Sequence, residues 1–325
     1  MRYLTFLLLL LTGCGQYQHP VDNLFADYLS RIANVQDESP LVLPENQIVT
    51  LPEKRELIID IEPVTLGLLD SYELRKCGLF NLIAEKNSVL GKVQDEFREF
   101  DFQIALLKGL KHCLTVEVVS PELRQTLASI YSQKQSQFAH YRANLLFTSA
   151  TMRNQLSSQE WIAIENQITS NQLLRGYHAL LLAQKFEQTA DAVTITPHQE
   201  VLDKNNAMGQ LWFSMHNANL KLQLITQQLY KFDSKIVCQV GRDSTKFRYL
   251  NNVFNLIYIE QIQPYIARVD AHYFRLEPYI AMLENAHPKY RYPIRDAHNA
   301  FRGASLEHVQ YWQQLFERCG KKVSR

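Results

Sequence analysis

The sequence predicts a mainly α fold, a multi-helix bundle-like body that can divide into two packed helical subdomains, with minor short strands. Apolar residues recur at alternating steps of three and four, and capping residues stand where these patterns begin. Of the 325 residues, 46% are apolar, which is enough to bury a sizeable core. Lys and Arg number 34 against 33 Asp and Glu, so we expect no nucleic-acid partner.

Residues 1–13 have the order of a secretory signal peptide. Arg2 supplies a positive charge, residues 3–11 are apolar, and Leu11-Thr12-Gly13-Cys14 follows directly. The apolar run is about half of the ~20 residues that a membrane-spanning helix needs. Leu-Thr-Gly-Cys resembles the bacterial lipobox, so we expect lipidation at Cys14. An ordinary signal peptide followed by an incidental cysteine is the alternative.

Residues 14–21 are expected to be the lipidated N-terminus and a short tether. Gly15 follows the cysteine instead of the aspartate that is typical of retention in the inner membrane. We therefore expect a lipid anchor in the periplasmic face of the cell outer membrane, with the membrane itself as a partner. Residues 15–21 reach at most ~25 Å when extended, so the folded part should lie close to the membrane.

Four cysteines remain after Cys14, and an even number in an exported chain suggests disulfides. Three connectivities are possible. Short loops and the helical layout favour Cys77 with Cys113 and Cys238 with Cys319, and four free thiols are the alternative. No two cysteines have the C-x-x-C spacing, so we expect no metal site, no cofactor and no redox activity.

Two apolar stripes and one cap predict helices in the first half of the chain. The stripes run from Val89 to Leu107 and from Leu123 to Leu145. Ser120-Pro121 places a capping hydroxyl before a proline at the first helical position. We expect helices near 22–36, 64–85, 89–112 and 121–148.

The second half carries the longest apolar seam. Steps of three and four run from Met208 to Leu229, a coiled-coil-like pattern. Ser157-x-x-Glu160 is a capping box that favours a helix start. We expect helices near 158–189, 198–231, 246–285 and 305–319. The third of these must bend or break, because Pro264 and Pro278 each lack an amide hydrogen.

Proline-containing and β-branched segments are expected to be extended. Residues 37–62 hold three prolines among apolar residues and should cross the surface without helix. Candidate short strands are residues 57–61, 114–119 and 236–240. The small, polar residues 149–158 favour a boundary between an N-terminal helical subdomain, 22–150, and a C-terminal helical subdomain, 151–325.

Short motifs spread over the mature chain resemble one family. They are Gly67-Leu68-Leu69-Asp70, Cys77-Gly78-Leu79, Asn87-Ser88-Val89-Leu90-Gly91-Lys92-Val93 with Cys113, and His308-Val309-Gln310-Tyr311-Trp312 with Cys319. Together they resemble an uncharacterised family of gammaproteobacterial lipoproteins, classed as a domain of unknown function. That family usually has arginine where this chain has Lys86, and lysine does not reproduce a bidentate contact. The resemblance implies a lipoprotein location in the cell envelope and implies no known activity.

Lys86, Asn87 and Ser88 are candidate ligand contacts, because they lie between two helical patterns with Lys92 nearby. The structural interpretation competes with this one. In it, Asn87-Ser88 is a tight turn, with a left-handed backbone at Asn87 and a helix cap at Ser88.

The C-terminal third gathers histidines, tyrosines and Trp312. His298, His308 and Trp312 are candidate ligand contacts there, and His308 and Trp312 share a helix face. His272, His287 and Asp296 widen the candidate set for an acid–base site. The spacings fit no compact metal-binding motif, and an ordinary aromatic core explains the same residues.

Two hypotheses about function follow. The first is a structural, adaptor or accessory binding protein of the cell envelope with an envelope protein partner, and on this hypothesis the chain is not an enzyme. The alternative is an envelope hydrolase or a small-ligand-binding protein with its site in the His- and Tyr-rich C-terminal third. A deep pocket with convergent ionisable groups would favour the alternative.

Overall fold

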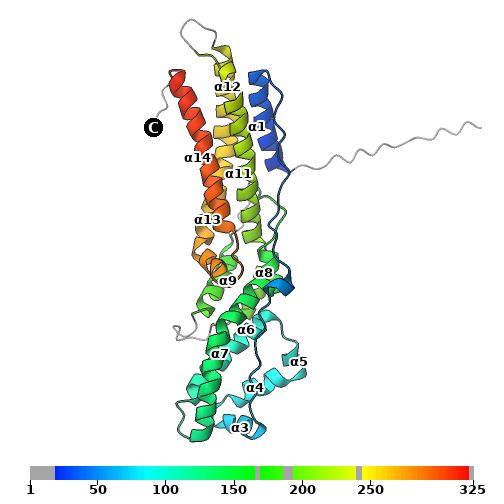
Figure 1. Ribbon diagram of the computed structural model, residues 1–325, viewed down its shortest axis with the longest axis vertical. Helices are drawn as coiled ribbons and strands as arrows, with labels where there is room; N and C mark the ends of the chain where they lie inside the picture. The colour runs from blue at the N-terminus through cyan, green and yellow to red at the C-terminus, as the bar shows by residue number, and fades with distance from the viewer. Residues whose placement is uncertain (1–18, 165–168, 186–192, 239–243, 322–325) are drawn as a thin grey trace, which may run out of the picture.

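A computed structural model describes residues 19–164, 169–185, 193–238 and 244–321 (Figure 1). The molecule is a rod of two helical bodies joined end to end. The upper bundle contains α1 (Pro20–Gln36), α11 (Ala207–Lys231), α14 (Ile294–Arg318) and one long helix formed by α12 (Thr245–Val253), a π-helical stretch (Phe254–Ile262) and α13 (Gln263–Glu284). The lower body is built on α6 (Glu96–Cys113) and α7 (Pro121–Thr148).

The upper bundle forms around the apolar seam of α11. Every position of that seam is buried, and α11 packs against α1, α13 and α14. The first helix of the chain therefore lies with the last ones, and its Phe25, Tyr28 and Ile32 are fully buried. Helices that bury such a stripe gain most of their stability from packing instead of propensity.

The lower body is an antiparallel pair, α6 and α7, with short helices on one side (Figure 1). Ser120 caps α7 and accepts a hydrogen bond from the amide of Leu123, as the sequence predicts. The short elements are α3 (Leu68–Glu73), a 3₁₀ turn (Leu74–Cys77), α4 (Phe80–Asn87) and α5 (Val89–Lys92). The lower end has a small core of its own, which includes Leu110, Leu123 and Leu127.

A waist of short helices joins the two bodies. It contains α8 (Ala150–Gln155), α9 (Asn171–Ala183), a 3₁₀ turn (Thr196–His198) and α10 (Gln199–Asp203). Gln155 lies at its centre, fully buried, and its amide donates to the carbonyl oxygens of Leu202 and Asn205. The proposed boundary near residue 150 falls between α7 and α8.

Residues 38–66 form a strap that runs along the side of the rod and contains the single-turn helix α2 (Lys54–Leu57). Side-chain amides bind its extended backbone. Asn217 of α11 accepts from the amide of Gln47 at 2.7 Å and donates to its carbonyl at 2.9 Å. Asn144 of α7 makes the same two bonds with Ile59, both at 2.9 Å. At Gln47 and Ile59, a side-chain amide therefore satisfies the backbone groups that a neighbouring strand would otherwise bind.

The prediction of short strands is wrong for the residues that the structure describes. Residues 57–61 lie partly in α2 and partly in the strap, where Asn144 takes the place of a partner strand. Residues 114–119 form turns between α6 and α7, and residues 236–238 follow a 3₁₀ turn (Asp233–Lys235) without strand pairing. Residues 239 and 240 lie outside the described residues.

Several predicted helices are interrupted where a local signal overrides the apolar pattern. Residues 64–85 are divided at Gly78, whose φ of 78° ends a 3₁₀ turn. Residues 89–112 restart at Asp95, which caps α6 through the amide of Arg98. The expected capping box at Ser157 does not form, because Ser158 instead bonds the amide of Glu160 in a turn that precedes α9.

The long helix does not break at Pro264, nor at Pro278, which lies inside α13. A π-helical stretch ends at Ile262, and Pro264 stands at the start of α13, where its missing amide hydrogen leaves no gap in an α-helical ladder. The last helix begins at Ile294, eleven residues before the predicted start. No helix of the described residues is long and apolar enough to cross a bilayer.

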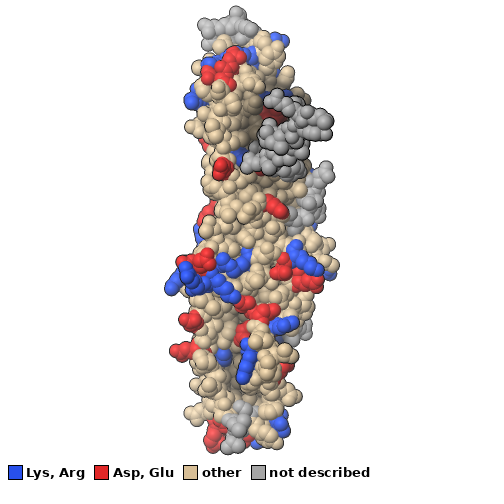
Figure 2. Space-filling view, turned by 90° about the vertical axis from the view of Figure 1, so that its right-hand side faces the viewer, with Lys and Arg blue, Asp and Glu red and all other residues tan. Residues whose placement is uncertain are grey.

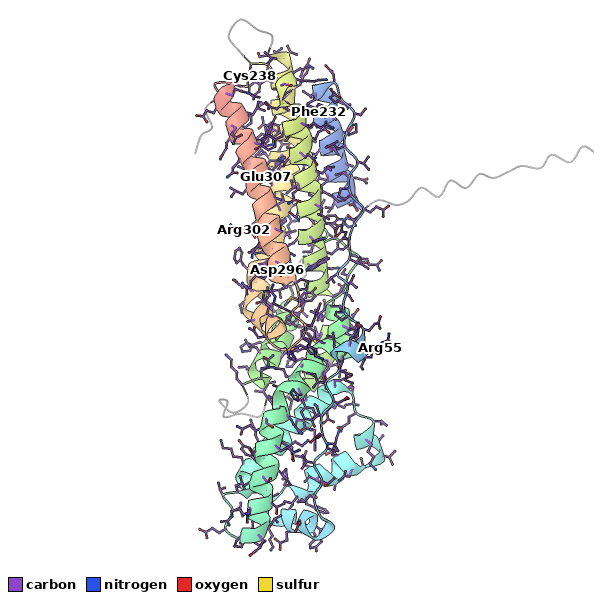
Figure 3. The ribbon with its side chains drawn as sticks, in the orientation of Figure 1. Arg55, Phe232, Cys238, Asp296, Arg302 and Glu307 are labelled. Atoms are coloured by element: carbon purple, nitrogen blue, oxygen red, sulfur yellow. A yellow bond between two sulfur atoms is a disulfide. The ribbon has the colours of Figure 1, made fainter. Side chains whose placement is uncertain are left out.

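Both expected disulfides are confirmed. Cys77 is bonded to Cys113 in the lower body, and Cys238 is bonded to Cys319 at the upper end, where Figure 3 labels Cys238. Cys113 and Cys319 lie at the ends of α6 and α14, so each disulfide ties the end of a long helix to a neighbouring segment.

Candidate functional site

The lower body contains a cavity of about 470 Å³ between α4, α6, α7 and the end of the strap. Its volume lies within the ~300–1,000 Å³ of small-molecule sites. The lining residues are Ile61, Pro63, Val64, Thr65, Leu66, Leu74, Ile83, Lys86, Asn87, Glu99, Phe102, Gln103, Leu106, Leu110, Leu127, Ile130, Lys134 and Tyr141. We call it the amphipathic pocket, since its polar groups gather at one end.

The polarity of this pocket follows from the register of the two antiparallel helices. Along α6, Glu99 and Gln103 are followed by Leu106 and Leu110 at steps of three and four. Along α7 the order is reversed, with Leu127 and Ile130 before Lys134 and Tyr141. Antiparallel packing therefore brings the polar residues of both helices to one end and the leucines to the other.

Lys134 is the central polar residue of the pocket. It is 7% exposed, and its ammonium donates to the Tyr141 hydroxyl at 2.9 Å and lies 5.1 Å from the centre of the Tyr141 ring. No carboxylate within the described residues is within ion-pairing distance of it. Burial lowers the pKa of Lys134, and the charge of Glu99 opposes this shift in part.

Glu99 is the acidic residue nearest to Lys134 in the pocket lining, and its carboxylate is already bound by two other side chains. Lys86 forms an ion pair with Glu99 and donates to Gln94 Oε1 at 3.2 Å. Gln103 also donates its amide to Glu99, at 2.7 Å. Two lysines and one glutamate thus leave one excess positive charge at the polar end. Gln103 Oε1 is buried and has no hydrogen-bond partner.

Tyr141 adds a hydroxyl donor. Burial raises the pKa of Tyr141 to about 12, so the phenol is neutral near pH 7. Its oxygen accepts from Lys134, which leaves its own proton available for a ligand oxygen. The polar end therefore brings an ammonium, a phenol hydroxyl and an amide oxygen to the same partly open pocket.

The candidate residues at the end of α4 divide between two roles. Lys86 and Asn87 line the pocket. Ser88 caps α5 by accepting from the amide of Gly91 at 3.1 Å, so the structural interpretation holds for it. The left-handed backbone expected at Asn87 is wrong, since Asp37 is the sole non-glycine residue with positive φ in the described part of the chain.

His308 and Trp312 lie in the core of the upper bundle. His308 is fully buried, and Trp312 is 1% exposed. The indole N–H of Trp312 can only donate, so His308 Nε2 is the acceptor at 3.0 Å, and Nδ1 carries the proton that points to Thr226 Oγ1 at 2.8 Å. The Tyr28 hydroxyl also lies 3.0 Å from Nε2. Burial lowers the pKa of His308 to about 3, so the imidazole is neutral.

His298 is likewise a packed residue. Its ring stacks on Tyr273 with centroids 3.4 Å apart, and its Nε2 lies 2.7 Å from Asp270 Oδ1. Asp296 is two residues earlier on α14 and points outward to a surface ion pair with Arg291 (Figure 3). Among the described residues no three His, Cys, Asp or Glu side chains converge on a metal-sized site.

His308 and Trp312 therefore contact each other inside the core, and neither they nor His298 and Asp296 line the pocket. A second hollow, about 330 Å³, lies at the upper end and is lined by Phe247, Arg248, Tyr249, Asn251, Asn252 and Lys321. It includes none of the histidines or Trp312. Figure 2 shows the face on the right-hand side of Figure 1. Positive and negative side chains are mixed on this face and form no stripe of one sign.

Lys134 and Tyr141 were missed as site residues, although the sequence contains a signal for one of them. The apolar stripe of α7 steps from Ile130 to Phe138, and the position midway between them, four residues from each, is Lys134. A lysine inside an apolar stripe must either pair with a carboxylate or bind something else. The pattern alone does not say which.

The fold and the pocket define an elongated, mainly α-helical protein with an amphipathic cavity in its lower body. The chain belongs to a family described as "Protein of unknown function (DUF3080)", which matches residues 25–323. The expectation of a family of unknown function is confirmed over this range, and the expected gammaproteobacterial lipoprotein nature of that family stays a prediction. Comparison with curated proteins and with solved structures finds no match.

Proposed function

We propose that the protein is an outer-membrane-anchored periplasmic lipoprotein that acts as an accessory binding protein of the cell envelope. Its ligand site is the amphipathic pocket. Support for the address comes from the leader, from Cys14 and from two disulfides, which are typical of exported proteins. The binding role rests on one observation, the ammonium of the buried Lys134, which faces the partly open pocket without a carboxylate partner in the described residues.

The chemistry of the pocket favours binding over hydrolysis. The side chains that line it include no histidine, cysteine or serine. Its hydroxyls belong to Thr65 and to Tyr141, whose raised pKa keeps it protonated. Hydrolysis through a serine or cysteine nucleophile would need that residue beside a general base, and neither residue type lines the pocket.

A pocket-filling variant tests the binding role. Ile130→Trp places a larger side chain in the pocket, and Leu306→Trp on the exposed face of α14 is the matched control. The full chain is purified from envelopes, denatured and extracted, and the extract is analysed by mass spectrometry. We expect a stoichiometric small molecule with the parent and the control and its loss with Ile130→Trp. The absence of any bound molecule from the parent contradicts the proposal.

The lipid anchor is tested separately through Cys14. Replacing it in Cys14→Ser should move the protein from the outer-membrane fraction to soluble or uncleaved material, since the acyl chains supply the membrane affinity. Continued co-sedimentation of a processed Cys14→Ser chain with the outer membrane contradicts the assignment.

The expected envelope protein partner also remains a proposal, and one surface supports it. Val89, Leu90 and Val93 are 83, 80 and 75% exposed, which is unusual for a cluster of apolar residues. Their position is fixed by Gly91, because a Cβ there would lie 2.2 Å from the backbone oxygen of Glu85. We call these three residues the α5 tip.

Site-specific crosslinking tests the α5 tip. A photoreactive residue at Leu90 should yield one reproducible protein adduct in intact cells, and the same residue at Val42, an exposed apolar position of the strap, should not. Adducts with lipid alone, or the same adducts from both positions, contradict a protein partner at the tip.

A further inference from the structure

We infer that the amphipathic pocket binds a single-chain amphiphile with an anionic head group, such as a fatty acid or a lysophospholipid. The head lies beside Lys134 and Tyr141, and the acyl chain points toward Leu110. This inference rests on the proposed binding function and specifies its ligand class. It is carried by the shape, the charge and the hydrogen-bonding groups of the pocket.

The shape of the pocket fits an elongated ligand. The lining residues of α6 extend from Glu99 to Leu110, which at ~1.5 Å per residue is about 16 Å along the helix axis. Leu106, Leu110 and Leu127 at the lower end are buried apolar side chains. A long cavity that is apolar at one end and polar at the other matches one acyl chain with one head group. A compact polar metabolite would leave the leucine end without contacts.

The charge of the pocket selects an anion. Lys86 and Glu99 neutralise each other as an ion pair, so Lys134 supplies the excess positive charge. A buried charge is costly unless it is paired, and a ligand carboxylate or phosphate would provide the missing partner. A cationic head group would meet Lys134 and be repelled. The site therefore discriminates between amphiphiles by the sign of the head group.

The remaining polar groups favour a head group that also carries a hydroxyl. The amide hydrogens of Gln103 face the Glu99 carboxylate, so its Oε1 is the atom left without a partner. A glycerol hydroxyl can donate to this oxygen, whereas an ionised fatty acid has no proton to donate. Tyr141 donates to the anionic oxygen in either case. A lysophospholipid should therefore bind more tightly than a fatty acid of equal chain length.

Defined probes test these statements on the full chain. Laurate and lauroyl lysophosphatidylglycerol are the anionic probes, dodecyltrimethylammonium is the cationic one, and dodecyl maltoside is the neutral one. Affinities are measured by isothermal titration calorimetry below the micelle concentration of each. The variants are Lys134→Met, Ile130→Trp and, as a control for the loss of one charge, Lys111→Met on the exposed side of α6.

Five results are expected. The anionic probes bind at least about tenfold more tightly than dodecyltrimethylammonium, and the lysolipid binds more tightly than laurate. Lys134→Met lowers the affinity for both anionic probes by about tenfold or more, the ratio expected for the loss of a charge-assisted hydrogen bond. The affinity of this variant for dodecyl maltoside stays within about twofold of the parent value. Ile130→Trp lowers the affinity for all probes. Lys111→Met leaves the affinity for every probe unchanged.

The opposite outcomes overturn the inference. Equal affinity for the cationic and the anionic probes refutes the anionic head group, and unchanged anionic affinity in folded Lys134→Met refutes the role of that lysine. If the protein purified from envelopes carries a bound molecule without an acyl chain or an anionic group, the binding function is supported and the inferred ligand class is wrong. If Ile130→Trp alters neither the probes nor the extracted ligand, the pocket is not the site and both proposals fail.

Discussion

Two buried lysines distinguish the two bodies of this molecule. Lys221 of the upper bundle has a side chain that is 5% exposed, and its ammonium lies 3.1 Å from Asp22, which also accepts the indole hydrogen of Trp161 at 2.9 Å. Lys134 of the lower body is buried to a similar degree but contacts a phenol oxygen instead of a carboxylate.

The contrast extends to the surroundings of each lysine. In the upper bundle, Tyr28, Thr226, His308 and Trp312 bind one another, although Trp212 Nε1 and Asn219 Oδ1 of α11 have no hydrogen-bond partner in the described part of the chain. In the pocket, Lys134 lacks a counter-ion among the described residues and Gln103 Oε1 lacks a donor. The difference between the bodies is therefore the buried lysine without a counter-ion, which costs stability, and such a cost is characteristic of binding sites.

The paired lysine should be the more costly one to replace. Lys221→Met leaves Asp22 largely buried without its cation, and we expect a loss of about 3–5 kcal/mol in the free energy of unfolding of the upper bundle. Hydrogen exchange of α11 and α14 in denaturant measures it. A loss under about 1 kcal/mol would show that the two lysines do not differ as described.

The disulfide of the lower body should matter more than that of the upper end. The double change Cys77→Ser and Cys113→Ser removes a crosslink over 36 residues from the body with the smaller core, and a loss of roughly 2–4 kcal/mol is expected in the protection of α6 and α7. Removing Cys238–Cys319 should affect the upper tip alone. Equal losses throughout the rod after either change would contradict this difference.

The two asparagine contacts with the strap provide a matched pair. Asn144→Leu and Asn217→Leu each remove two hydrogen bonds to strap backbone, at a cost of about 1–3 kcal/mol. Only Asn144→Leu loosens the strap residues beside the pocket wall. The rate of amide hydrogen exchange at residues 61–66 should therefore rise in Asn144→Leu and stay unchanged in Asn217→Leu. Equal exchange at these residues in both variants would rule out local control of the pocket wall.

The pH dependence of stability should reveal His308 in the upper bundle. Burial holds the pKa of His308 at about 3 in the fold, whereas the unfolded value is about 6.5. The neutral ring therefore contributes fully to the free energy of unfolding above pH ~6.5. As the pH falls below this value, the contribution is lost at up to about 1.4 kcal/mol per pH unit. His308→Gln should flatten the profile between pH 6.5 and pH 4.5, and His140→Gln at an exposed position should not. A parallel profile for His308→Gln would contradict the account.

The long helices were predictable because their signals are local. The cap at Ser120 and the stripe from Leu123 to Leu145 predict α7 from end to end. The failures arise from tertiary contacts. Asn144 lies about 85 residues from Ile59, so no local pattern shows that an amide side chain replaces a strand there. The apolar pattern near residue 160 likewise gives way to a turn that packs against α11, where Ser214 bonds the amide of Ile162.

The site was predictable only in part, for a related reason. Lys86 and Asn87 stood out as polar residues between two helices, and they do line the pocket. His308 and Trp312 stood out by residue type, yet the fold buries both in a complete hydrogen-bond network. The lysine in the α7 stripe was visible, but its lack of a carboxylate depends on which residues of α4 and α6 pack against it.

The stability of Lys134→Met without ligand is the most direct test of the claim that this lysine is kept for binding. The change removes an unpaired buried charge and retains the apolar stem, so the free energy of unfolding of the lower body should rise by about 1 kcal/mol or more, measured by hydrogen exchange of α6 and α7 in denaturant. A decrease of the size expected for Lys221→Met would mean that Lys134 is a structural residue, and would contradict the assignment of the pocket as a ligand site.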